Sequence, residues 1–248
     1  MFITGTMIER LHRWGGLLAD VIYPRDCLHC GELVDSSECE YLCVRCEARL
    51  DWIQGNFCDS CGYPYVGIGA NQSCSHCELL NPAFERGRCC LLHREVGASL
   101  VKALKYHRGR YVKGDLQRIA KKVPGLDAFV RGTVLVPVPL NRTRERERGF
   151  NQSLFIARAW AEVLPVVGVE PILERVRWTG TQTQLERKER MRNVKNAFRL
   201  KENTSLIADL TYTIIDDVFT TGSTLNECSR VLRANGVQHL RVLALAHG

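Results

Sequence analysis

The sequence has no apolar run long enough to cross a membrane, which needs about twenty residues. The nearest candidate, residues 14–23, is too short, and no small-residue cleavage site marks it as a secretory signal. These absences predict a cytoplasmic protein with no stable membrane insertion. Met7 is a second candidate start, and residues 8–22 predict a short amphipathic helix that packs on the rest of the chain.

Two motifs of common enzyme classes are also missing. The hydroxyl-rich loop at residues 220–224 contains no Gly-Lys-Ser or Gly-Lys-Thr, so it is not a P-loop. Residue 2 is Phe, whereas a glutamine-fed amidotransferase needs an N-terminal cysteine nucleophile, so that subclass is excluded. With 45% hydrophobic and 25% charged residues in 248, the chain can hold one α/β domain and a small module.

Eight of the twelve cysteines form four Cys-x-x-Cys pairs with a regular spacing. Adding 31 to each position of the first two pairs gives the last two, and Gly31 and Gly62 follow the same rule. In a reducing cytoplasm this repeat indicates zinc rather than disulfides. Four thiolates fill a zinc shell, so both sites are predicted to be structural and to supply folding energy. The predicted ligands are Cys27, Cys30, Cys43, Cys46, Cys58, Cys61, Cys74 and Cys77.

The spacing leaves the pairing of these ligands open. Sequential pairing places the first four cysteines at one zinc and the last four at the other, and interleaved pairing is the alternative. Cys39 breaks the repeat, because Ala70 stands 31 residues further on, and is predicted to be a free thiol. His29 and His76 lie inside pairs and are predicted to be bystanders.

Charge divides the chain unevenly. Residues 27–77 carry seven Asp or Glu and two Lys or Arg, a formal charge of −5. Because the whole chain carries +7, the residues outside this segment carry +12. Many zinc ribbons bind nucleic acid, but an acidic ribbon cannot do so by attracting phosphates. The cysteine-rich segment is therefore predicted to be a docking or stabilising module, and a polyanion should bind the larger part.

Residues 213–224 predict a ligand site at the carboxyl end of a buried strand. Asp216 and Asp217 end the strand, and a helix follows, with Asn235-Gly236 as its stop and residues 240–246 as the next strand. Adjacent carboxylates suit vicinal hydroxyls, and a hydroxyl-rich loop at a helix N-terminus suits a phosphate. The pattern therefore predicts a ribose 5-phosphate site, whose loop residues are Thr220, Thr221, Gly222, Ser223 and Thr224.

Basic residues cluster around a second predicted strand, residues 134–140. The basic segment 140–149 is predicted to be an anion-binding loop, followed by a helix that runs towards Leu164. Residues 179–185 are polar and predict a mobile lid. The predicted anion ligands of the loop are Arg144, Arg146 and Arg148, and the predicted nucleic-acid contacts are Lys105, Arg108, Arg148, Arg187, Lys188, Arg190 and Arg192.

The run at 213–224 resembles the phosphoribosyl-diphosphate motif of type I phosphoribosyltransferases. That resemblance implies that Asp216 and Asp217 hold the ribose hydroxyls, that the 220–224 loop holds the 5-phosphate, and that the diphosphate, with magnesium, contacts the 140–149 loop. Together with the cysteine pairs, Lys105-Tyr106, the segment 136–139, the run 148–152, Arg192-Asn193 and Ala197-Phe198, the chain from about Pro24 onward is similar to the ComF family.

This second resemblance implies an α/β fold, with a mostly parallel sheet and flanking helices, preceded by a double zinc ribbon. The implied divisions are an extension at 1–25, the ribbon module at 26–80 and a phosphoribosyltransferase-like domain at 81–248. It also implies a part in natural transformation, handling incoming single-stranded DNA beside a helicase that docks on the zinc module.

Three functions fit the sequence. The first is single-stranded DNA handling by a protein that keeps a sugar-phosphate site, with Tyr106, Phe150 and Trp178 as candidate stacking platforms. The second is phosphoribosyl transfer to an unknown acceptor. The third is a regulator that senses phosphoribosyl diphosphate and signals through the zinc module. We expect the first, with ligand binding more strongly supported than turnover.

Overall fold

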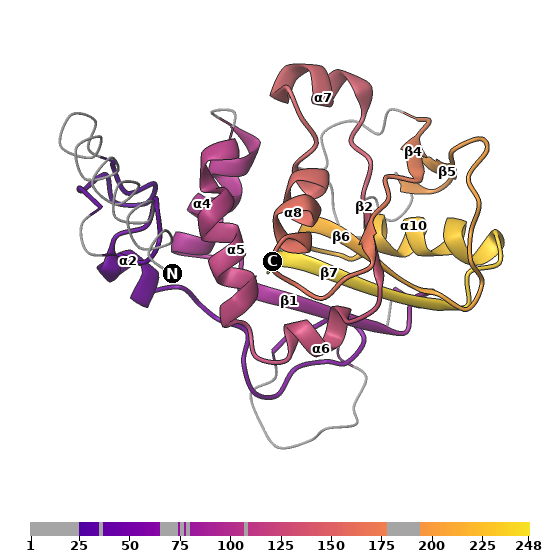
Figure 1. Ribbon diagram of the computed structural model, residues 1–248, viewed down its shortest axis with the longest axis horizontal. Coiled ribbons are helices and arrows are strands. Elements are labelled where there is room, and N and C mark those ends of the chain that lie inside the picture. The colour runs from indigo at the N-terminus through magenta and orange to yellow at the C-terminus, as the bar shows by residue number, and fades with distance from the viewer. Residues whose placement is uncertain are drawn as a thin grey trace, which may run out of the picture.

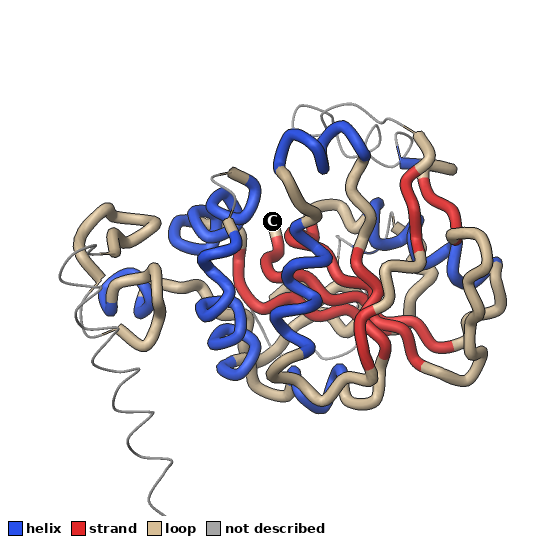
Figure 2. The backbone as a smooth tube through the Cα atoms, turned by 45° about the horizontal axis from the view of Figure 1, so that its top comes forward, coloured by secondary structure: helices blue, strands red, loops and turns tan. Residues whose placement is uncertain are grey.

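The fold is taken from a computed structural model that describes residues 25–34, 37–64, 74, 77, 80–106, 109–177 and 194–248. A five-stranded parallel sheet lies at its centre, in the order β1-β7-β6-β2-β3 (Figure 1, Figure 2). A separate antiparallel pair joins β4 and β5. The strands are β1 Arg86–Leu92, β2 Val134–Pro137, β3 Gly168–Val169, β4 Leu173–Arg175, β5 Phe198–Leu200, β6 Thr211–Phe219 and β7 His239–His247.

Helices cover both faces of this sheet, which confirms the expected fold class. Neighbouring residues of the central strands point to opposite faces. Ile215 packs with α4 (Glu95–Lys105), α5 (Lys113–Lys122) and α8 (Gln152–Ala161), whereas Ile214 packs with α10 (Ser223–Ala234). No helix among the described residues is long and apolar enough to span a bilayer. The helices are α2 Val44–Ala48, α4 Glu95–Lys105, the 3₁₀ turn η1 Arg110–Val112, α5 Lys113–Lys122, α6 Leu126–Val130, α7 Arg142–Arg148, α8 Gln152–Ala161 and α10 Ser223–Ala234.

The two cysteine units lie on opposite faces of the sheet. The first, around α2, packs with α4 and α5, whereas the second packs with α10 and the other face. The segment 51–53 between them runs along the free edge of β1, with an antiparallel bridge from Trp52 to Leu91 and an Ile53 N–H bond of 3.0 Å to the Cys90 carbonyl. The linker therefore covers a sheet edge that would otherwise be open.

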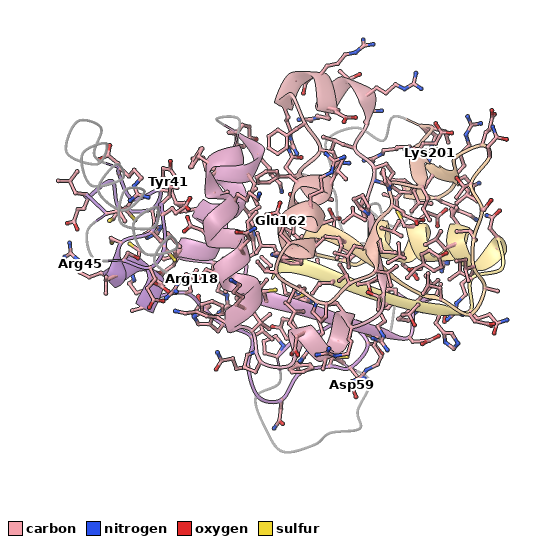
Figure 3. All side chains as sticks on the ribbon, in the orientation of Figure 1. Tyr41, Arg45, Asp59, Arg118, Glu162 and Lys201 are labelled. Atoms are coloured by element: carbon pink, nitrogen blue, oxygen red, sulfur yellow. The ribbon has the colours of Figure 1, made fainter. Side chains whose placement is uncertain are left out.

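A buried carboxylate fixes the first unit to α5. Asp115, fully buried, accepts hydrogen bonds from the backbone N–H groups of Glu40 (2.6 Å) and Tyr41 (3.1 Å). Arg118, which is labelled in Figure 3, donates through Nε to Glu47 at 2.8 Å from the same helix. Burial raises the pKa of the Asp115 carboxyl to about 6.

Replacing Asp115 with alanine should destabilise the protein by about 2–4 kcal/mol, because two buried N–H groups lose their acceptor. A carboxyl whose pKa is raised on folding stabilises most when protonated, so the deficit should grow as the pH falls through about 6. Chemical denaturation at pH 5 and pH 7 measures both effects. Asp127→Ala, which removes an exposed pair with Arg131, is the control and should cost under about 1 kcal/mol at either pH.

Two predicted boundaries were wrong. The basic segment predicted to be a loop contains helix α7, because Asn141 caps it by accepting from the Thr143 N–H and Gly149 ends it at φ 78°. Figure 1 shows α7 at the top of the molecule, away from the sheet. The acid pair does not end its strand, because β6 continues to Phe219.

Candidate functional site

The eight repeat cysteines form two clusters with sequential pairing. In each cluster the four sulfur atoms lie within 4.8 Å of one another. The first cluster consists of Cys27, Cys30, Cys43 and Cys46, and the second of Cys58, Cys61, Cys74 and Cys77. Sulfur separations of 3.7 Å for Cys58 and Cys77, and 3.4 Å for Cys61 and Cys74, are near the roughly 3.8 Å of a tetrahedral zinc thiolate site. Both clusters therefore fit structural zinc, and interleaved pairing was the wrong alternative.

The sequence repeat is also a repeat of backbone geometry. The Cys27 N–H donates to the Glu32 carbonyl, and 31 residues on the Cys58 N–H donates to that of Tyr63. Gly31 and Gly62 have φ values of 75° and 74°, which favour glycine at this turn. Each turn brings the two thiols of a pair to the same side.

Cys39 and His29, the other possible zinc ligands among the described residues, belong to neither cluster. Cys39 is buried and lies outside both clusters, and burial raises the pKa of its thiol. The Nδ1 atom of His29 lies 2.9 Å from the Ser99 hydroxyl. His76 falls outside the described residues.

The acid pair lies where β6 is paired on one side only. The partner β2 follows β6 as far as Ile215, whereas β7 continues beside it to Phe219. Pro139 follows β2 and has no N–H with which to extend the ladder. The edge of β6 at Asp216 and Asp217 that β2 leaves unpaired is therefore open for a ligand.

Asp216 accepts two hydrogen bonds, one of them from a residue that the sequence did not indicate. Its Oδ1 atom accepts from the Ser153 hydroxyl of α8 at 3.0 Å and from the Asp217 N–H at 2.9 Å. Burial, and then the charge of Asp217, raise the pKa of this carboxyl to about 7. Asp216 is thus poised to change charge near neutral pH.

Lys105 neutralises the second acid. Its Nζ atom lies 2.9 Å from Oδ2 of Asp217, and the two side chains are 28% and 15% exposed. Lys105, predicted as a nucleic-acid contact, is therefore placed at the acid pair. His93 lies nearby, and burial together with the Lys105 charge lowers its pKa, which favours the neutral ring.

The hydroxyl-rich loop forms a tight turn into α10. Gly222 has a φ of 72° and precedes the first helical residue, Ser223. The Thr221 and Ser223 hydroxyls lie 2.7 Å apart, and the Ser223 N–H is 3.4 Å from the Thr221 oxygen. Hydroxyls and N–H groups thus converge at the N-terminus of a twelve-residue helix, as anion binding requires.

The second cysteine unit supports this loop from behind. A Cβ atom at Gly222 would lie 2.7 Å from a methyl group of Leu80 and 2.5 Å from the Phe219 ring. Asn226 of α10 donates to the Leu80 carbonyl at 2.8 Å and accepts from the Ala83 N–H at 2.7 Å. The Leu80 N–H in turn donates to the carbonyl of Cys77, a cluster residue.

One cavity of about 320 Å³ joins the acid pair to basic side chains. Of the three arginines predicted for the neighbouring segment, Arg144 and Arg148 line it, whereas Arg146 lines an adjoining cavity. Arg148 also donates to Gln152 at 2.8 Å. Carboxylates and guanidinium groups thus line one cavity, which suits a ligand with hydroxyls and phosphates.

Sequence reasoning missed two residues of this cavity. Arg175 lines it from β4, and burial lowers the pKa of its guanidinium. Ser153 bonds to Asp216 from the first turn of α8. The only sequence signal for Arg175 was its place at the start of a basic stretch, and Ser153 directly follows the 148–152 run.

Several predicted nucleic-acid contacts fall outside the described residues: Arg108, Arg187, Lys188, Arg190 and Arg192, as do the 179–185 lid and Trp178. Phe150 is buried against Phe155 and cannot stack on a base, which corrects one candidate platform. Tyr106 is 56% exposed at the cavity.

Known proteins are similar both to the cysteine-rich segment and to most of the chain. Residues 18–78 match the family model of the double zinc ribbon domain. The chain is 29% identical to competence protein F of Haemophilus influenzae, over 83% of this chain and 96% of that protein. It is 32% identical to the DNA utilization protein YhgH of Salmonella typhimurium (82% and 89%) and 27% identical to competence protein ComFC of Bacillus subtilis (79% and 80%).

Fold and site together define a parallel α/β protein with a double zinc-ribbon module and a cleft between an acid pair and arginines. The similarity to the first two relatives covers 96% and 89% of their length. The chain belongs to the ComF family.

Proposed function

We propose that this protein acts in DNA uptake or utilisation and binds a sugar phosphate of the phosphoribosyl-diphosphate type in the acid-pair cavity. The observation that carries the proposal is the cavity itself, which joins Asp216 and Asp217 to Arg144, Arg148 and Arg175. The ribose hydroxyls bind at the carboxylates, the 5-phosphate at the 220–224 loop and the diphosphate at the arginines.

Magnesium accompanies the diphosphate in this proposal. Carboxylate and phosphate oxygens are the ligands that Mg²⁺ prefers, and two carboxylates line the cavity. Asp217 is paired with Lys105 in the free protein, so the ammonium group offsets a carboxylate charge until the metal-bound ligand arrives. Magnesium neutralises phosphate charge, and Asp216 and Asp217 position the sugar.

The DNA part of the proposal comes from the relatives and from charge. Their names tie them to competence and DNA utilisation. Outside residues 27–77 this chain carries a formal +12, and its arginine-lined cavities lie in that part. Single-stranded DNA should therefore bind at or beside the sugar-phosphate cavity, with an affinity that falls as salt rises.

The first experiment is a titration of phosphoribosyl diphosphate with magnesium. Wild-type protein should bind, and Asp216→Asn/Asp217→Asn should lose about a hundredfold or more in affinity, because two charged acceptors are removed. Asp127→Asn, on the exposed side of α6, is the matched control and should bind like wild type.

Single-stranded DNA measured in the same samples tests whether the two ligands share the cavity. Competition between them would support one shared site, whereas independent binding would separate the DNA surface from it. A folded wild type that binds no phosphoribosyl diphosphate would refute the ligand proposal. Assays of diphosphate release with nucleobases and amines then test turnover.

The pKa of Asp216 predicts a pH dependence. A carboxyl with a pKa of about 7 is about one-tenth ionised at pH 6, so ligand affinity should fall about tenfold between pH 8 and pH 6. Burial and the Lys105 charge lower the pKa of His93, which favours its neutral form. Calorimetric titrations at saturating magnesium measure ligand affinity as a function of pH. The Asp216→Asn variant lacks the titrating carboxyl, so its pH dependence shows the effect of protonating the ligand itself. Matching slopes in both proteins would contradict the assignment.

A sensor role is a second candidate, favoured by the contact of Leu80 with the loop at Gly222. Ligand in the loop and a partner on the second ribbon then act through one packed junction. In this reading the partner is the DNA-uptake helicase, docked on the acidic zinc module. Partner affinity measured with and without phosphoribosyl diphosphate tests it, and equal affinities would eliminate it.

A further inference from the structure

The two cysteine clusters differ in how far solvent can reach their residues. Seven of the eight candidate zinc ligands are buried, whereas Cys30 of the first cluster is exposed. Cys61 stands 31 residues further on, at the equivalent position of the repeat, and is 0% exposed. Because the two cysteines hold the same place in turns of the same kind, the difference must come from what packs against each turn.

The packing around each turn gives the cause. Gly62, which follows Cys61, lies against strand β1, and a Cβ atom added to it would be 2.8 Å from the backbone nitrogen of Cys89. The Cys89 thiol also donates to the Cys61 carbonyl at 3.6 Å. At the equivalent Gly31, no atom of the described residues lies within 4 Å of an added Cβ. The sheet therefore covers the second turn, and the first turn faces solvent.

Exposure decides which sulfur can react while both clusters hold zinc. A zinc-bound cysteine is a thiolate, and the thiolates that solvent can reach are the ones that peroxides oxidise. A buried sulfur becomes accessible only after its cluster has opened. The Sγ atom of Cys43 lies 3.7 Å from that of Cys30, so a second sulfur stands next to the exposed one.

We propose that Cys30 is an oxidation site, at which hydrogen peroxide converts the first cluster from a zinc site to a disulfide. The Cys30 sulfur attacks one peroxide oxygen, an S–O bond forms as the O–O bond breaks, and the leaving hydroxide takes a proton to become water. The Cys43 sulfur then attacks the sulfur of this sulfenic acid, an S–S bond replaces the S–O bond, and a second hydroxide leaves as water. Two electrons pass from the two thiolates to the peroxide, two protons are consumed, and zinc loses two of its four ligands.

Oxidation acts on the first unit and spares the second. Structural zinc supplies on the order of 10 kcal/mol of folding energy, so a cluster left with two thiolates no longer holds its unit. That unit contains Glu40 and Tyr41, whose backbone N–H groups bond to Asp115 of α5. The second cluster keeps its zinc and its packing on β1. The oxidation site lies outside the acid-pair cavity and does not depend on what that cavity binds.

The test uses the full chain loaded with two zinc ions. Hydrogen peroxide is added together with the chromogenic chelator 4-(2-pyridylazo)resorcinol, which reports zinc as it is released. We expect one zinc per chain to be released about tenfold or more faster than the other. Alkylation of the remaining thiols and peptide mapping should then find a disulfide between Cys30 and Cys43, with the second cluster still reduced.

The repeat supplies a matched pair of variants. Cys30→His keeps a zinc ligand, because imidazole binds zinc, but it removes the exposed thiolate, so the fast release should be lost. Cys61→His makes the same change in the buried turn and should leave the fast release of the first zinc intact. Zinc content measured before oxidation shows whether each variant is loaded.

Peptide mapping of wild-type protein decides the proposal even if a variant fails to bind zinc. Release of both zinc ions at one rate, or oxidation of the second cluster before the first, would overturn it. A first disulfide that lacks Cys30 would also overturn it. A disulfide that joins Cys30 to Cys27 or Cys46 would overturn the choice of Cys43 as its partner.

Discussion

Replacing Cys61 and Cys77 with serine should unfold the second ribbon and weaken phosphate binding at the 220–224 loop by about tenfold or more. Structural zinc contributes on the order of 10 kcal/mol to ribbon folding, so its loss cannot be absorbed locally. The effect reaches the loop because Leu80, bonded to the Cys77 carbonyl, packs against Gly222. Zinc content per chain and titration with phosphoribosyl diphosphate measure the two consequences.

The first ribbon supplies the control for this experiment. Its cluster packs on the opposite face of the sheet with α4 and α5, so Cys30→Ser/Cys43→Ser should lose one zinc and stability while loop affinity changes little. Leu80→Ala is a milder probe that keeps all eight thiols. It should cost about 2–5 kcal/mol of stability and lower loop affinity, and unchanged affinity in a folded Leu80→Ala protein would contradict the coupling.

Gly222→Ala should be the most damaging single methyl group in the site. The residue has a φ of 72°, and the added Cβ would lie 2.5 Å from the Phe219 ring and 2.7 Å from Leu80. Left-handed strain of about 1–2 kcal/mol adds to overpacking of about 1–3 kcal/mol. We expect a destabilisation of about 2–5 kcal/mol and a large loss of sugar-phosphate affinity, measured by denaturation and titration.

Gly132→Ala isolates the backbone part of that effect. Gly132 has a similar φ of 68°, but no atom lies within 4 Å of its added Cβ. It should cost only the conformational strain and leave ligand affinity unchanged. Equal destabilisation by the two substitutions would show that the contacts with Phe219 and Leu80 do not constrain the loop.

Local chemistry explains what the sequence could predict. The cysteine repeat identified the eight candidate ligands, because each Cys-x-x-Cys pair closes a turn of the same kind, as the matched hydrogen bonds of Cys27 and Cys58 show. The acid pair and its loop were also recognisable, because strand, acids, loop and helix follow one another directly. The division of the eight cysteines between two zinc sites could not be predicted, because the spacing alone permits two arrangements.

Residues brought together by tertiary folding were missed. Arg175 and Ser153 reach the cavity from β4 and α8, far from Asp216 along the chain. Helix α7 was missed because it has no buried residue and hence no apolar period, and its two end caps were the only signal. The contact between Leu80 and Gly222 joins segments more than a hundred residues apart, which no local pattern encodes.

The linker at residues 51–53 has a consequence for folding in the cell. It covers the free edge of β1, and a four-cysteine cluster lies on each side of it along the chain. An uncovered parallel-sheet edge is a template for pairing with another chain. Zinc bound at the two clusters would therefore limit association between chains as well as hold the fold, and a chain without zinc would leave the edge of β1 open to pairing with another chain.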